Sequence, residues 1–329
     1  MPPRVACTAL NSHYGPHLEI LQKAGFEPVI PPLGMKLSDP QHLIASLEEC
    51  EAVIAGSEPY TPEVFAALPK LRVIARWGVG FDAVNLQEAD ARKIVVATTP
   101  GCNHHSVAEL AITMLMAVSR GFPRLDQQVR AGKWVRIPLP RLQGKTLGLV
   151  GLGRIGQATA TRAVGLGMKV IAYDPFPPQE FARQHGIELV DLDTLFARSP
   201  FISLHLPATA ETKHLINKNS LGKMQPGTII VNTSRGPLIN EADLAEALAS
   251  GHLGGAGLDV FETEPLPLDS PLMKFDNVLL SGHVAGMDKE SECDTATMAA
   301  NIIVGLYNGK WPEGCVQNLK HLSPTAWKW

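Results

Sequence analysis

The sequence predicts an α/β protein that consists of two doubly wound parallel-sheet domains. The chain has 329 residues, of which 45% are apolar, enough for about two domains with separate cores. Short β-branched runs bounded by Gly, Pro or Asp alternate with stretches of helical length. Two such series follow one another, so two sheets are expected.

The first series covers residues 5–98 and predicts one complete doubly wound unit. Strands are expected at 5–10, 27–30, 52–56, 72–76 and 94–98, with helices at 17–24, 40–50, 61–68 and 85–91. An apolar helix that ends near residue 119 follows. Ser106 and Glu109 predict its start, because a Ser followed three residues later by a Glu is typical of a capping box.

The second series predicts a second sheet, followed by a long C-terminal helix. Its strands are expected at 146–150, 169–173, 188–190, 201–205, 228–233, 256–261 and 278–281, and the helix at 288–307. The tail after this helix has no strand partner in the second sheet, so we expect it to fold back onto the first domain. The predicted domains are therefore 1–101 with 288–329, and the inserted segment 102–287.

Charge and cysteine content exclude several classes of protein. The formal charge of −3 creates no field that attracts nucleic acid or an acidic membrane. The longest apolar window, residues 110–118, is too short to span a bilayer, and the N-terminus lacks the pattern of a secretory signal. Five scattered cysteines without ligand spacing predict no metal site and fit a cytoplasmic protein.

A glycine-rich turn follows the first strand of the second series. Gly151, Gly153 and Gly156 form a GxGxxG pattern that opens a helix, whose N-terminus suits a pyrophosphate. Asp174 stands at the end of the next strand, where a carboxylate accepts ribose hydroxyls and repels a 2′-phosphate, which favours NAD over NADP. The turn alone leaves open another α/β protein, such as a methyltransferase.

Reactive side chains follow three consecutive strands of the second series. Arg235, Glu264 and His283 should share one sheet edge, because ligands lie beyond the carboxyl ends of parallel strands. His283 would be the acid–base group, Glu264 would raise its pKa and fix its tautomer, and Arg235 would hold a carboxylate and polarise the adjacent carbonyl. Taken singly, they could be a surface arginine, a solvated carboxylate and a structural histidine.

With these residues the chain resembles the D-isomer-specific 2-hydroxyacid dehydrogenase family. The resemblance is carried by WGVGFDAVN (77–85), NHHSVAELA (103–111), GKTLGLVGLGRIGQ (144–157), VNTSRGPLIN (231–240), GLDVFETEPLP (257–267) and HVAG (283–286). It implies a Rossmann nucleotide-binding domain inserted in a flavodoxin-like substrate domain. It also implies an NAD-dependent enzyme that interconverts a D-2-hydroxy acid and its 2-keto acid, with Arg235, Glu264 and His283 catalytic.

The resemblance also assigns contacts and partners. Predicted cofactor contacts are Gly151, Gly153, Arg154, Ile155, Gly156, Asp174, Pro207, Thr233, Ser234, Asp259, His283 and Gly286. Predicted substrate contacts are Arg76, Gly78, Val79, Gly80, Asn103 and Arg235. The partners expected are a small 2-hydroxy or 2-keto acid and a second copy of the chain, bound through the nucleotide-binding domain.

Among family members, the chain is most similar to those that resemble phosphoglycerate dehydrogenase but lack a regulatory domain. Arg76 and Arg136 would then hold a distal phosphate. Gly56 and Ser57 depart from this pattern, because an arginine usually follows the third strand of such enzymes. Glyoxylate or hydroxypyruvate reductase activity therefore stays open, as does a corepressor-like protein that senses the dinucleotide.

Overall fold

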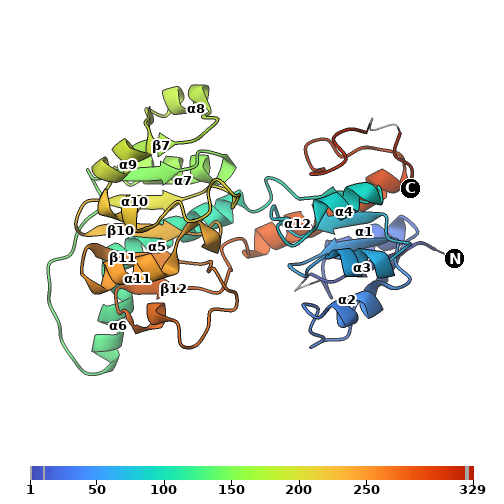
Figure 1. Cartoon of the computed structure of the whole chain (residues 1–329), viewed down its shortest axis with the longest axis horizontal. Helices are drawn as coiled ribbons and strands as arrows, with labels where there is room; N and C mark the ends of the chain where they lie inside the picture. The colour runs from blue at the N-terminus through green and yellow to red at the C-terminus, as the bar shows by residue number, and fades with distance from the viewer. Residues whose placement is uncertain (1, 10–11, 323–325) are drawn as a thin grey trace. The chain divides into compact units, whose positions relative to one another are not determined.

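The computed structural model describes residues 2–9, 12–322 and 326–329. The chain forms two compact units, Met1–Asn103 with Asp288–Trp329, and His104–Met287. Each contains one parallel sheet with helices on both faces (Figure 1). The predicted pair of doubly wound sheets is therefore confirmed. Residue 10, the last of the first predicted strand, lies outside the described residues.

The first unit contains a five-stranded sheet of order β2-β1-β3-β4-β5. Its strands are β1 (Arg4–Cys7), β2 (Glu27–Val29), β3 (Ala52–Ala55), β4 (Val73–Arg76) and β5 (Val95–Ala97). The register pairs Val5 with Ala52 and Val53 with Ile74. All residues of β3, β4 and β5 are buried, as expected for strands that are covered on both faces.

Five helices cover the first sheet: α1 (Pro16–Lys23), α2 (Pro40–Leu47), α3 (Pro62–Ala67), α4 (Leu86–Ala91) and α12 (Lys289–Tyr307). Leu21 of α1 and Ile303 of α12 belong to one apolar cluster, whereas Leu43 of α2 and Phe65 of α3 belong to another. Figure 1 shows α12, coloured orange to red, in contact with the blue α1. The end of the chain therefore completes the core begun by the N-terminal residues.

The second unit contains a seven-stranded parallel sheet of order β12-β11-β10-β9-β6-β7-β8. The strands are β6 (Thr146–Val150), β7 (Lys169–Tyr173), β8 (Glu188–Leu189), β9 (Phe201–Leu204), β10 (Thr228–Asn232), β11 (Leu253–Leu258) and β12 (Val278–Leu280). The helices are α5 (His104–Ser119), α6 (Phe122–Arg130), α7 (Arg154–Gly165), α8 (Gln179–Gln184), α9 (Leu192–Arg198), α10 (Lys218–Gly222) and α11 (Glu241–Ala249), with two 3₁₀ turns, η1 (Gly236–Leu238) and η2 (Pro271–Lys274). Two apolar clusters, which include Leu115 of α5 and Leu244 of α11 respectively, form the core.

Two sequence predictions in this unit are wrong. The capping box at Ser106 does not form, because α5 already begins at His104 and the Ser106 hydroxyl donates to the Ala285 carbonyl at 2.6 Å. The strand expected at 256–261 is β11, Leu253–Leu258. The strand thus begins three residues earlier than expected, and a Cβ on Gly257 would lie 2.8 Å from the Cβ of Met114. A glycine strand is needed here because α5 packs directly on it.

Candidate active site

The glycine turn between β6 and α7 has the geometry of a phosphate cradle. A Cβ on Gly156 would lie 2.2 Å from the carbonyl oxygen of Gly151, so only glycine allows the helix to start this close to the strand. Gly153 is the N-cap of α7, and a Cβ there would meet nothing within 4 Å. Arg154 and Ile155 form the first helical residues. The helix N-terminus thus faces open space, as an anion site requires.

Asp174 follows β7 and lies against this turn. Its Oδ2 accepts the backbone N–H of Leu152 at 2.7 Å, and its Oδ1 accepts that of Phe176 at 2.8 Å. A pocket of about 460 Å³ adjoins it, lined by Tyr173, Asp174 and Val190 together with Ala172, Pro177, Leu189, Asp191 and Thr194. An apolar wall next to a carboxylate suits an adenine ring and its ribose.

The other predicted cofactor contacts follow further strands of the same parallel sheet. Pro207 follows β9, Thr233 and Ser234 follow β10, Asp259 follows β11, and Gly286 lies in the loop after β12. The Thr233 hydroxyl is buried and makes no hydrogen bond to the described residues. A buried polar atom without a partner at this edge is what a bound cofactor would satisfy. The residues present therefore fit a dinucleotide.

Arg235 is brought to the site by a close contact between two backbone segments. It directly precedes η1, and a Cβ on Gly236 would lie only 1.9 Å from the carbonyl carbon of Phe261. The end of β10 can therefore lie against the segment that carries Glu264 only because residue 236 has no side chain. The positive charge of Arg235 is close enough to act on both Glu264 and His283, although more weakly than the hydrogen bond that joins these two residues.

His283 and Glu264 form a direct pair. His283 Nδ1 lies 2.8 Å from Glu264 Oε2, and Glu264 Oε1 accepts the backbone N–H of Phe261 at 3.0 Å. The hydrogen bond to Glu264 raises the pKa of His283, against the opposing effect of burial. Burial favours a higher pKa for Glu264, but the bonds from His283 and Phe261 hold it below its usual value. The His283 side chain is 51% exposed, so Nε2 can meet a substrate.

Asp259 positions the loop that carries His283. Its side chain is completely buried and accepts the backbone N–H groups of Val284 and Ala285, both at 2.9 Å, and the Ser281 hydroxyl at 2.5 Å. The backbone N–H of His283 donates to the Asp259 carbonyl at 2.7 Å. The sequence predicted Asp259 as a cofactor contact. It did not predict this hydrogen-bond network, because Ser281, which donates to Asp259, belongs to no recognised motif.

The predicted substrate residues Arg76, Gly78, Val79, Gly80 and Asn103 belong to the first unit. Arg76 ends β4, and its Nε donates to the Gly80 carbonyl at 2.9 Å. The side-chain Oδ1 of Asn103 is buried without a hydrogen-bond partner among the described residues, and its Nδ2 lies 3.9 Å from where a Cβ of Gly78 would be. Asn103 therefore adjoins the glycine loop. The substrate-binding roles of these residues stay predictions.

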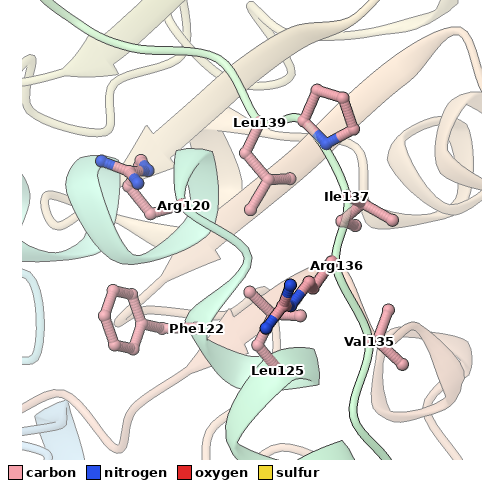
Figure 2. Close-up of a pocket in the computed structure, with 8 residues that line it drawn as sticks. Arg120, Phe122, Leu125, Val135, Arg136, Ile137 and Leu139 are labelled. Atoms are coloured by element: carbon pink, nitrogen blue, oxygen red, sulfur yellow. The ribbon is translucent and has the colours of Figure 1, made fainter.

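A further pocket in the second unit involves none of the catalytic candidates. It has a volume of about 540 Å³ and is lined by Arg120 before α6, by α6 itself and by the loop that follows: Phe122, Leu125, Val135, Arg136, Ile137, Pro138 and Leu139 (Figure 2). Arg136, predicted to hold a phosphate, lies here, and Arg76 belongs to the other unit. The phosphate role of Arg136 also stays a prediction.

Among the described residues, no three His, Cys, Asp or Glu side chains are grouped so that they could hold a metal ion. No helix in this part of the chain is long and apolar enough to cross a membrane.

Comparison with known proteins identifies the family. The model for the NAD-binding domain of D-isomer specific 2-hydroxyacid dehydrogenases matches residues 112–285. A glyoxylate reductase of Korarchaeum cryptofilum is 40% identical over 281 residues, which cover 83% of this chain and 85% of that protein. The chain belongs to the D-isomer specific 2-hydroxyacid dehydrogenase family.

Two further relatives extend the comparison. A D-3-phosphoglycerate dehydrogenase of Mycobacterium tuberculosis is 44% identical over 268 residues, 80% of this chain and 51% of that protein, so the present chain spans about half of its length. A D-lactate dehydrogenase of Aquifex aeolicus, solved with NAD and lactic acid, superposes with a TM-score of 0.82 at 26% identity, covering 93% of this chain and 96% of that one.

The predictions of the family, of an oxidoreductase and of NAD as cofactor are confirmed by these relationships. A methyltransferase, which the glycine turn alone left open, is thereby excluded. These three relatives are named after different substrates: glyoxylate, D-3-phosphoglycerate and D-lactate. Family membership therefore establishes the reaction class and leaves the substrate open.

Asp174→Ala tests the cofactor assignment. We expect weaker NADH binding and a smaller preference for NADH over NADPH, because the carboxylate that would repel a 2′-phosphate is removed. Titrations of both nucleotides, followed by fluorescence, would measure the two dissociation constants. Asp193→Ala is a matched control on the exposed start of α9, and an unchanged NADH-to-NADPH ratio in Asp174→Ala would refute the role.

Proposed function

We propose that the protein is an NAD-dependent dehydrogenase that interconverts a short D-2-hydroxy acid and its 2-keto acid. The observation that carries this proposal is the His283–Glu264 pair, at 2.8 Å, on the sheet that also carries the dinucleotide turn and Asp174. A hydride donor and a proton donor are the two components that reduction of a carbonyl needs.

When NAD is bound, its nicotinamide would supply or accept the hydride. In the reductive direction, His283 Nε2 donates its proton to the carbonyl oxygen, and in the oxidative direction it removes the proton of the hydroxyl. Glu264 accepts the hydrogen bond from Nδ1, which fixes the tautomer and stabilises the charged ring. Arg235 holds the substrate carboxylate in a planar fork and polarises the neighbouring carbonyl.

A substrate panel tests this proposal. We expect the protein to oxidise NADH, followed by the absorbance of NADH, when a 2-keto acid such as glyoxylate or hydroxypyruvate is present. A corepressor-like protein would instead bind NADH tightly with negligible turnover of every 2-keto acid. That result would overturn the catalytic proposal while leaving the NAD site intact.

The proposal includes a homodimer formed through the second unit. Support comes from α6 and the loop after it, where Phe122, Val129, Trp134, Val135 and Ile137 are all exposed. A cluster of exposed apolar side chains of this kind usually marks a contact surface.

A cytoplasmic location is also proposed, supported by five cysteines that are all free.

Light scattering on a sizing column tests the dimer. We expect twice the chain mass of 35.4 kDa for the unaltered protein and a monomer for Trp134→Glu, because a charge would be buried in the interface. Phe176→Glu is the control, since Phe176 is also exposed but lies outside this segment. A monomeric wild-type protein would contradict the proposal.

A further inference from the structure

Three backbone segments of the second unit meet beside the catalytic candidates. They are the loop after β9, the turn η1 that follows Arg235, and residues 261–264 after β11. A Cβ on Gly236 would lie 2.5 Å from the backbone nitrogen of Glu262, so the turn is in direct contact with the third segment. The way in which these segments are joined therefore decides where Arg235 lies relative to Glu264.

Glu262 is hydrogen-bonded to both other segments. Its Oε1 lies 2.6 Å from Nε2 of His214, in the loop after β9. Its Oε2 accepts the backbone N–H of Glu241, the first residue of α11, at 3.0 Å, and Glu241 Oε1 accepts the backbone N–H of Glu262 at 2.6 Å in return. These three residues form the Glu262 joint, in which one carboxylate uses both oxygens to connect three segments.

His214 is held in a conformation that its surroundings must maintain. Its φ of 51° lies in the left-handed region, which is unfavourable for a residue with a side chain. Its backbone N–H donates to the Pro237 carbonyl in η1 at 2.8 Å, and Asn217 Nδ2 donates to its carbonyl at 2.8 Å. These contacts fix the backbone of His214 in the position from which its ring reaches Glu262.

The Glu262 joint adjoins the catalytic pair. Glu264 lies two residues after Glu262, and its carboxylate is hydrogen-bonded to His283 and to the backbone N–H of Phe261. Burial raises the pKa of the Glu241 carboxyl, and the charges of Glu262 and Glu264 raise it further. The joint and the pair thus lie within electrostatic reach of each other. A shift of residues 261–264 would change the distance between Glu264 and His283.

We propose that Glu262 is a positioning residue for the reaction: by joining His214 and Glu241, it fixes the segment of Glu264 against the turn that follows Arg235. This inference rests on the proposed dehydrogenase function. Glu262 acts through the backbone that carries Glu264, and so through the contact of Glu264 with His283. A displacement of about 1 Å near reacting groups can lower a rate about a hundredfold, so turnover should depend on this joint.

Glu262→Ala removes the joint, and Glu262→Gln is the rescue variant. In Glu262→Ala, the kcat/KM for glyoxylate or hydroxypyruvate should fall about tenfold to a hundredfold, with the dissociation constant of NADH nearly unchanged. In Glu262→Gln most of the activity should return, because the amide can accept the N–H of Glu241 and donate to Nε2 of a neutral His214. Glu246→Ala is the matched control: it removes an exposed ion pair of α11 with Lys218, at 3.0 Å, and should leave kcat/KM unchanged.

The pH profile gives a readout that a loss of folded protein would not move. Reduction requires the proton of His283, and the hydrogen bond to Glu264 raises the pKa of His283. Release of the Glu264 segment in Glu262→Ala would weaken this bond. The fall of kcat/KM with rising pH should therefore come at a lower pH than in the wild-type protein. A smaller folded fraction would lower kcat/KM without moving this fall.

His214→Ala tests the same joint from its other side. It should lower kcat/KM and shift the pH profile in the same direction as Glu262→Ala. The double variant should be no worse than Glu262→Ala alone, because both substitutions break the same joint. If Glu262→Ala does not fold, His214→Ala decides: a kcat/KM and a pH profile equal to those of the wild-type protein would overturn the inference.

The outcomes separate the two proposals. Wild-type kcat/KM in folded Glu262→Ala would overturn the inference, and so would a fall in kcat/KM without a shift of the pH profile, which would show a purely structural role. Both results would leave the dehydrogenase function standing, because the wild-type protein still turns over. Absence of NADH oxidation by the wild-type protein with every 2-keto acid would refute the proposed function itself, and this inference with it.

Discussion

His283→Ala should lower kcat by about two to four orders of magnitude, the contribution typical of a positioned acid–base group. NADH binding should be nearly unchanged, since His283 is half exposed and its ring is held by Glu264. Single-turnover kinetics would measure the reduction step, and fluorescence titration would measure the dissociation constant of NADH. Turnover retained at the wild-type level would remove His283 from the mechanism.

Glu264→Gln is the companion variant for the pH dependence. The raised pKa of His283 means that its proton is kept to a higher pH than for an isolated imidazole. Reduction requires this proton, so the kcat/KM for a 2-keto acid should fall as pH rises through that raised pKa. Without the Glu264 charge the fall should come at a lower pH. An identical pH profile in both proteins would show that the pair does not control the proton.

Arg235→Gln should lower the kcat/KM by about two to three orders of magnitude, because a pair of charge-assisted hydrogen bonds to the substrate carboxylate is lost. Arg235→Lys keeps the charge and should recover only part of this loss, since an ammonium group cannot bind a carboxylate in a planar fork. Steady-state kinetics should show a higher KM and a lower kcat together, because the guanidinium both binds and polarises the substrate.

A second readout distinguishes this role of Arg235 from a structural one. The Arg235 charge lowers the pKa of His283, so Arg235→Gln should shift the fall of the reductive pH profile to higher pH. Arg183→Gln, at the exposed end of α8, should change neither the rate nor the profile. Loss of activity without a shift of the profile would point to damage of the fold instead.

Much of the candidate site could be predicted because its residues follow strands in order along the chain. Arg235, Glu264 and His283 come after three consecutive strands, and parallel strands end at one edge. The spacing of the hydrophobic runs was therefore enough to predict that these three residues lie at one edge, without any information on contacts. Asp174 was predictable in the same way, from its place after the strand that follows the glycine turn.

Local patterns failed where a neighbouring element determined the outcome. Ser106 and Glu109 have the spacing of a capping box, yet α5 starts earlier and the Ser106 hydroxyl bonds to Ala285. The strand expected at 256–261 begins at Leu253 instead, and its Gly257 is required by the close approach of Met114. In both cases a contact between residues distant in sequence outweighs the local preference.

The succession of strands along the chain, the glycine turn and the motifs after the strands predicted the fold class, the dinucleotide and the reaction type, since each depends on spacing along one chain. The anchoring of the His283 loop by Asp259 and Ser281 could be seen only in the folded sheet. So could the joint that Glu262 forms with His214 and Glu241. Burial and charge balance are sums over neighbours from several strands, and no single stretch of sequence contains them.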